Sequence, residues 1–170
     1  MSSAIIFYSR SNNTRTGAEY IADKMGSELI ELTEAKGRKG LTGFIKSGYQ
    51  AVSGKTSHLQ GNPWEKAAKH SLIYLMTPIW AGKTTPAMNA FLNKADFKGK
   101  DVTVITFQAD EKGAGTEDVY NSIRQLVENG GGSFLGGYAM HSTAPGRFAG
   151  KEYIEKQLDH KYLSLVHKGE

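Results

Sequence analysis

The chain has 170 residues, of which 39% are hydrophobic and 22% charged, a balance typical of one globular domain with a full core. It contains no cysteine, which excludes disulfides, catalysis by a thiolate and metal sites with thiolate ligands. Its 21 basic and 17 acidic residues give a net charge of +4, but no basic motif carries interleaved aromatic residues, so we expect no nucleic-acid partner.

The first apolar run, residues 4–8, is too short for a signal peptide, and no segment is apolar over the length that a membrane span needs. We therefore expect a cytoplasmic protein without a membrane partner. No repeat or linker divides the chain, so residues 1–170 are expected to form a single domain.

Five short apolar runs alternate with helical patterns along the chain. Three of the runs are apolar almost throughout, as expected for strands buried on both faces of a parallel sheet. We therefore predict a doubly wound α/β sandwich of three layers, in which helices cover the parallel connections. The predicted strands cover residues 4–8, 28–32, 72–76, 102–107 and 133–140.

Apolar residues recur at helical spacing between these runs. Pro86 suits a first helical turn, and the glycines at 130–132 suit a helix end. The region 33–70 has a weaker pattern, in which we predict one helix at about 44–52. The predicted inward stripes are Ala18, Ile21, Ala22 and Met25; Met88, Phe91, Leu92 and Ala95; Val119, Ile123, Leu126 and Val127; and, in a last helix over 151–166, Ile154, Leu158, Tyr162 and Leu165.

A polar loop follows the first strand. Its hydroxyl groups can donate to phosphate oxygens, and Asn12 is of a type that tolerates the positive φ that a tight turn around an anion requires. The N-terminus of the next helix adds free N–H groups. An ordinary helix cap would need one such residue. The loop therefore predicts a phosphate site formed by Ser9, Arg10, Ser11, Asn12, Asn13, Thr14 and Arg15.

This loop resembles the Thr/Ser-x-Thr/Ser-Gly-Asn-Thr phosphate loop of the flavodoxin family. Ser9, Ser11, Asn13 and Thr14 match the pattern, and Asn12 takes the place of the family glycine. The resemblance covers the architecture of residues 4–140. It implies a flavodoxin-like fold with five parallel strands in the order 2-1-3-4-5, and non-covalently bound flavin mononucleotide (FMN) as the cofactor.

Two later loops resemble the flavin ring loops of the same family. After the third strand, Trp80 offers a flat surface for a ring, and Ala81 or Gly82 offers backbone groups to its edge. The loop after the fourth strand lacks the aromatic residue usual in flavodoxins, which leaves Tyr49, Phe148 and Tyr153 as candidates to cover the outer face. The ring-binding residues that the resemblance implies are Thr77, Pro78, Ile79, Trp80, Ala81, Gly82, Gln108, Ala109, Asp110, Gly113 and Gly115.

Three functions stay open at this point. The first is an FMN electron carrier that exchanges electrons with a redox partner protein or an NAD(P)H-dependent reductase, as a monomer or homodimer. The second is an FMN-dependent NAD(P)H reductase of quinones or nitro compounds, and the third is a flavin-free binding or regulatory module. We assign no catalytic residue, and the five histidines show no metal spacing. The chain lacks the glycine motifs of nucleotide triphosphatases and dinucleotide-binding domains.

Overall fold

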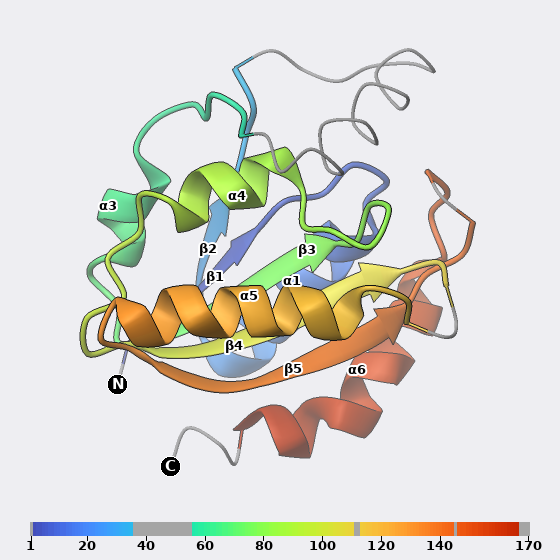
Figure 1. Ribbon diagram of the computed structural model, residues 1–170. Helices are drawn as coiled ribbons and strands as arrows, with labels where there is room; N and C mark the ends of the chain where they lie inside the picture. The colour runs from blue at the N-terminus through green and yellow to red at the C-terminus, as the bar shows by residue number, and fades with distance from the viewer. Residues whose placement is uncertain (1, 36–55, 111–112, 145, 167–170) are drawn as a thin grey trace.

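The structure is a computed structural model that describes residues 2–35, 56–110, 113–144 and 146–166, the last five of these by their backbone (Figure 1). Strands and helices alternate along the described chain. The strands are β1 (Ser3–Phe7), β2 (Glu28–Glu31), β3 (Leu72–Pro78), β4 (Asp101–Gln108) and β5 (Ser133–His141). The helices are α1 (Asn13–Met25), α3 (Pro63–Ala67), α4 (Pro86–Leu92), α5 (Thr116–Asn129) and α6 (Lys151–Val166).

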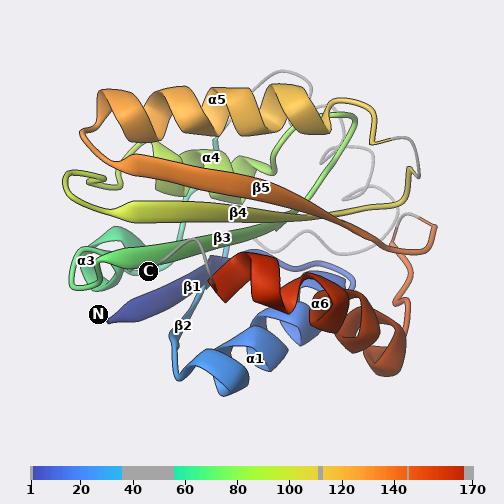
Figure 2. The ribbon, with the colours of Figure 1, turned by 90° about the horizontal axis from the view of Figure 1, so that it is seen from below.

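The strands form one parallel sheet in the order β2-β1-β3-β4-β5. Figure 2 shows this sheet between α1 and α6 on one face and α4 and α5 on the other. The predicted three-layer, flavodoxin-like arrangement is therefore confirmed. The chain winds away from β1 in two directions, and in open α/β sheets ligands bind beyond the carboxyl ends of the strands at such a point.

The residues of β1 alternate between two apolar clusters. Ala4 and Ile6 pack under α3, α4 and α5, whereas Ile5 and Phe7 pack under α1 and α6. All four are at most 2% exposed, as predicted for a strand covered on both faces. Burial of a large apolar side chain of this kind stabilises the fold by about 1.5–3 kcal/mol.

The helices follow most of the predicted stripes where the structure describes them. Leu126 is an exception, because it is 42% exposed and the neighbouring Val127 takes the buried position in that turn of α5. Ala95 lies beyond the end of α4 at Leu92. In α4, Pro86 occupies the first turn, and the Thr85 hydroxyl accepts the N–H of Met88 at 3.2 Å. In α6, Ile154 and Leu158 are fully buried. The side chains of the last two residues of that stripe, Tyr162 and Leu165, lie outside the described residues. No helix in the described ranges combines the length and apolar character needed to cross a membrane.

A polar contact joins α1 to α6. Asp159 Oδ1 accepts hydrogen bonds from the Tyr20 hydroxyl and from Lys24 Nζ, each at 2.6 Å. The hydrogen bond from Lys24, with that from Tyr20, holds the pKa of the Asp159 carboxyl below its usual value. The same bond to Asp159 raises the pKa of Lys24. The two helices are therefore held together at the surface as well as through their apolar faces.

The structure corrects several predicted boundaries. β3 extends to Pro78 and β4 to Gln108, because Pro78 pairs with Phe107 and Gln108 pairs with His141. The short helix α3 was not predicted, since five residues span too few turns for a helical stripe. The helix predicted at about 44–52 lies outside the described residues.

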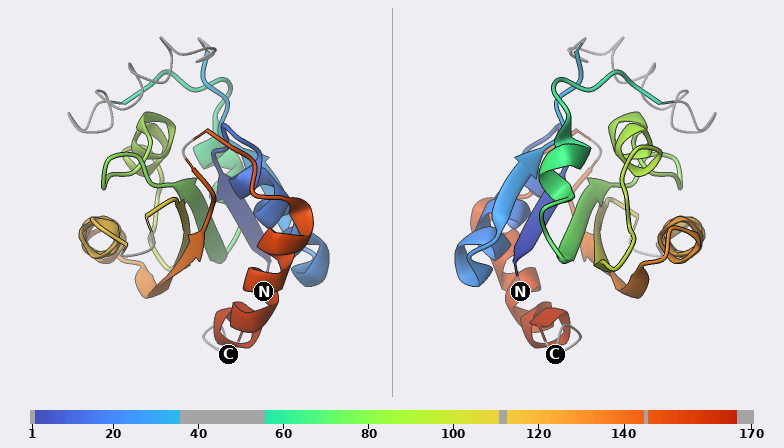
Figure 3. Two further views of the ribbon diagram at one scale, coloured as in Figure 1. Left: turned by 90° about the vertical axis from the view of Figure 1, so that its right-hand side faces the viewer. Right: turned by 90° about the vertical axis from the view of Figure 1, so that its left-hand side faces the viewer.

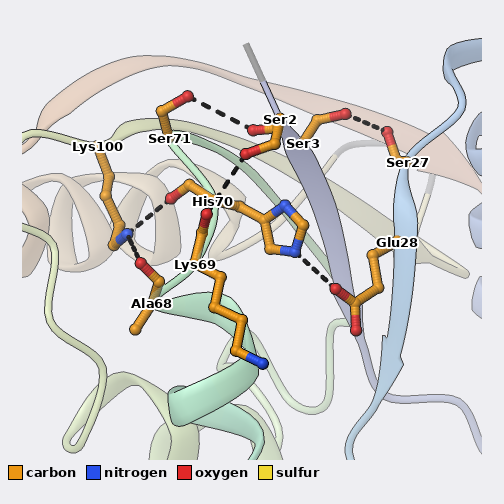
Figure 4. Close-up of polar contacts among 9 residues, drawn as sticks. All are labelled: Ser2, Ser3, Ser27, Glu28, Ala68, Lys69, His70, Ser71 and Lys100. Carbon is orange, nitrogen blue, oxygen red and sulfur yellow. Dashed lines mark hydrogen bonds and ion pairs between the residues drawn. The ribbon is translucent and has the colours of Figure 1, made fainter.

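The amino ends of the strands are joined by a network that Figure 4 shows. Lys100 is 8% exposed, and its Nζ donates to the carbonyls of Ala68 and His70 at 2.9 and 2.6 Å. The imidazole of His70 contacts the Glu28 carboxylate at 2.6 Å. These contacts fix the segment after α3 to the sheet at the end opposite to the candidate site.

Candidate functional site

The loop between β1 and α1 turns through Asn12, which has φ 66° and precedes the first turn of α1. The side chain of Asn12 makes no capping hydrogen bond to the helix. The positive φ is as predicted, whereas an ordinary N-cap would have used the side chain to accept a helix N–H. The first N–H groups of α1 therefore receive no hydrogen bond from the side chain at the N-cap position.

The two arginines of this loop point to different places. Arg10 lines a pocket at the carboxyl ends of the strands, and its guanidinium carbon lies 5.9 Å from the centroid of the Trp80 ring. Arg15 instead forms an ion pair with Glu31 at the end of β2 and lies over Phe7. The pocket therefore receives positive charge from Arg10 and not from Arg15.

Trp80 begins a tight turn that leaves β3. Its backbone N–H and C=O both bond to Lys83, at 2.9 and 3.0 Å. The two central residues, Ala81 and Gly82, have φ of 49° and 71°, as a type I′ turn requires. Ala81 is thus an alanine in a conformation that disfavours a Cβ.

The indole of Trp80 is held by its neighbours. The Tyr8 ring meets it edge to face, with centroids 5.7 Å apart and planes at 82°. The Tyr8 hydroxyl donates to Glu34 Oε2 at 2.9 Å, and both residues are less than 9% exposed. These contacts hold the indole in place as one wall of the pocket.

The loop after β4 is braced by its own polar groups. Gln108 Oε1 accepts the Thr116 hydroxyl at 2.5 Å, and Asp110 Oδ2 accepts the N–H of Ala114 at 2.7 Å. The side chain of Gln108 and one carboxylate oxygen of Asp110 are therefore engaged in shaping the loop. The described part of this loop carries no aromatic residue.

The two predicted ring loops touch each other through glycines. Gly115 has φ 78°, and a Cβ on it would lie 2.5 Å from Gly82 Cα and 2.6 Å from Gly82 O. A side chain at position 115 would therefore meet rigid backbone. The turn at residues 81–82 and the loop at 113–115 are packed as one surface.

One pocket, with a cavity volume of about 240 Å³, joins the three predicted loops. The predicted residues that line it are Arg10, Ser11, Asn13, Thr14, Pro78, Ile79, Trp80, Ala81 and Ala109. Those that lie outside its lining are Ser9, Asn12, Arg15, Thr77, Gly82, Gln108, Asp110, Gly113 and Gly115. The lining also contains Phe107, Ser142, Ala144 and Gly146, which were not predicted.

Ser142, Ala144 and Gly146 belong to the loop after β5, so this loop is a fourth wall of the pocket. This wall could have been predicted from the sequence, because the carboxyl ends of parallel strands lie along one edge of the sheet. Ser142 N–H donates to the Gln108 carbonyl at 2.7 Å, which brings the loop against β4. Of the residues considered as covers of a ring, Phe148 and Tyr153 are 49% and 43% exposed, and Tyr49 lies outside the described residues.

No protein-family profile and no curated protein sequence matches the chain. Solved structures do match it. A candidate flavoprotein from Bacteroides uniformis has 16% identity and a TM-score of 0.72, over 93% of this chain and 97% of that one. A flavoprotein from Lactobacillus acidophilus, solved in complex with FMN, has 19% identity and a TM-score of 0.64, over 81% and 92% of the two chains.

The oxidised flavodoxin 1 of Bacillus cereus has 17% identity and a TM-score of 0.56, over 98% of this chain and 99% of that one. These structures and the strand order together establish the flavodoxin-like fold for this chain.

Proposed function

We propose that this flavodoxin-like chain binds FMN, with the phosphate at the loop between β1 and α1 and the ring beside Trp80. The observation that carries the proposal is that one pocket brings Ser11 and Thr14 together with Trp80 and Ala81. Hydroxyls and a helix N-terminus suit the phosphate, and an indole suits the ring. The FMN in the Lactobacillus acidophilus structure supports the proposal by likeness of fold.

The residues of the phosphate loop fit this ligand. The Oγ of Ser9 is buried and has no hydrogen-bond partner among the described residues. A buried hydroxyl without a partner costs about 1–3 kcal/mol, and an anion oxygen in the loop would satisfy it. Arg10, which lines the pocket, adds positive charge near the anion.

FMN would supply one- and two-electron chemistry, and the chain would bind and orient it. Trp80, held by Tyr8 and Arg10, would fix one side of the ring and exclude water from it. The joined turn at residues 81–82 and loop at 113–115 would present backbone groups to the ring edge. We propose that the chain acts as an electron carrier that meets a redox partner protein or an NAD(P)H-dependent reductase.

A second candidate function is an FMN-dependent NAD(P)H reductase. The observation that favours it is that part of the pocket is lined by small side chains, those of Ala109, Ser142, Ala144 and Gly146. Small side chains leave room for a second flat molecule over a ring. Anaerobic addition of NADPH separates the two, since rapid bleaching of the bound flavin identifies the reductase and a stable yellow colour identifies the carrier.

Titration of the purified chain with FMN, followed by quenching of flavin fluorescence, tests the proposal. Thr14 is 1% exposed, so a change there would disturb the core as well as the site. Ser11→Asp is the sharper variant, because Ser11 is only half-buried and lines the pocket. It should abolish FMN binding through repulsion of the phosphate while riboflavin, which has no phosphate, still binds. A wild-type chain that takes up neither flavin would establish the flavin-free module instead.

A further inference from the structure

The side chain of Asn13 ties the phosphate loop to the loop between β5 and α6. Its Nδ2 donates to Ser11 Oγ at 3.1 Å and to the carbonyl of Arg147 at 2.8 Å. Its Oδ1 accepts the N–H of Ala149 at 2.8 Å. Asn13 is 5% exposed, so water competes little for these bonds. Figure 3 shows the two loops beside each other, one leading from β1 into α1 and one from β5 into α6.

These bonds fix the orientation of the amide and use all its hydrogens. Turning the amide over would set Nδ2 against the Ala149 N–H and Oδ1 against the Arg147 carbonyl, two repulsive contacts. A primary amide has two hydrogens, and Asn13 donates both within the protein. Phosphate oxygens act as acceptors, so the side chain of Asn13 has no hydrogen left for a phosphate.

The loop after β5 is held in its middle by Asn13. Gly146 and Gly150 have φ of 79° and 98°, and the three residues between them include both partners of Asn13. Gly146 lines the pocket. Loss of the hydrogen bonds of Asn13 would therefore loosen a wall of the pocket as well as the phosphate loop.

We infer that Asn13 is a positioning residue that couples phosphate binding to the position of residues 146–150. Because Ser11 Oγ accepts the Asn13 hydrogen, the hydroxyl hydrogen of Ser11 is available to a phosphate oxygen. A phosphate bound there favours the arrangement in which Asn13 also holds Arg147 and Ala149. The coupling is reciprocal, so a held loop raises phosphate affinity by the same factor. The inference rests on the proposed function, because the phosphate site in this loop is part of that proposal.

Exchange of the Ala149 amide hydrogen, followed by NMR without flavin, tests the coupling with inorganic phosphate as the probe. In the wild-type chain, phosphate at about ten times its dissociation constant should slow this exchange by up to about tenfold. In Asn13→Ala the amide loses its acceptor, so exchange without phosphate should be about fivefold faster or more. In this variant phosphate should no longer slow exchange of the Ala149 amide. The amide chemical shift of Thr14 reports that phosphate is bound.

Gln157→Ala is the matched control. Gln157 also holds a backbone with its amide, accepting from His141 N and donating to His141 O, each at 2.8 Å. Its bonds go to the end of β5 and not to the phosphate loop, so this variant should keep the effect of phosphate on Ala149. Equal slowing by phosphate in Asn13→Ala, or no slowing in a wild-type chain that binds phosphate, overturns the inference.

A second experiment compares FMN with riboflavin, which lacks the phosphate. Asn13→Ala should weaken binding of both flavins by about fivefold or more, since a pocket wall is loosened. Ser11→Ala should weaken only FMN. Asn13→Ser repeats the comparison of the two flavins in a variant that keeps a small polar group. Thermal melting followed by circular dichroism checks that this variant is folded.

A loss confined to FMN in both Asn13 variants would make Asn13 a phosphate ligand and overturn the inference. A chain that binds phosphate but neither flavin would instead overturn the proposed function, while the exchange experiment still decides the role of Asn13.

Discussion

Gly115→Ala is expected to separate the two loops that would hold a flavin ring. The new Cβ would lie 2.5 Å from Gly82 Cα, 2.6 Å from Gly82 O and 2.9 Å from Gly82 C, and none of these backbone atoms can rotate away. Holding an alanine at φ 78° costs about 1–2 kcal/mol. Overpacking adds about 1–3 kcal/mol. The free energy of unfolding should therefore fall by about 2–5 kcal/mol.

Gly99→Ala is the matched control for the backbone cost. Gly99 has φ 67°, and a Cβ there meets nothing within 4 Å. It also precedes β4, at the end of the sheet opposite to the pocket. This variant should lose only about 1–2 kcal/mol of stability.

Urea unfolding of both variants and FMN titration measure the difference. If about 1.4 kcal/mol of the clash is relieved by moving the loops apart, FMN affinity in Gly115→Ala should fall about tenfold. Gly99→Ala should bind FMN as the wild-type chain does. Equal stabilities and equal FMN affinities for the two variants would refute the close packing of the ring loops.

Three further outcomes are expected. Lys100→Met removes two charge-assisted hydrogen bonds to carbonyls and should lower the free energy of unfolding in urea by about 2 kcal/mol. The pKa of Asp159 is lower in the folded chain, so its stabilising effect is complete above the unfolded pKa near 4 and is lost as pH falls through the folded value; the difference in melting temperature between wild type and Asp159→Asn should vanish at low pH. Arg10→Ala should make the two-electron midpoint potential of bound FMN more negative by on the order of 20 mV, because reduction adds negative charge beside Arg10; an unchanged potential in spectroelectrochemical titration would contradict this.

The sheet and the turn at Asn12 could be predicted because they depend on local chemistry. An apolar run buried on both faces is visible in residues 4–7 alone, and the tolerance of asparagine for positive φ is a property of one residue type. The pocket loops after β1, β3 and β4 followed from their place after parallel strands. These features needed no knowledge of distant partners.

The features that sequence reasoning missed depend on residues far apart in the chain. Arg15 was predicted to face the phosphate, but β2 brings Glu31 within reach and the ion pair turns the guanidinium away. Gln108 was placed in a loop, but its pairing with His141 keeps it in β4. The loop after β5 could have been placed at the pocket from the shared edge of the parallel strands, but the hydrogen bonds that join Asn13 to Arg147 and Ala149, more than 130 positions away, could not. No local pattern carries such information.

Two residues in the described part of the chain hold a left-handed backbone without being glycine, Asn12 and Ala81. Ala81 lines the pocket, and Asn12 lies between two residues that line it, Ser11 and Asn13. Each such conformation costs on the order of 1 kcal/mol. Glycine at either position would remove this cost and so raise the free energy of unfolding with a single substitution. Each replacement would also give freedom to the backbone that shapes the pocket. Stability and ligand affinity would therefore make opposite demands on the backbone at these two positions.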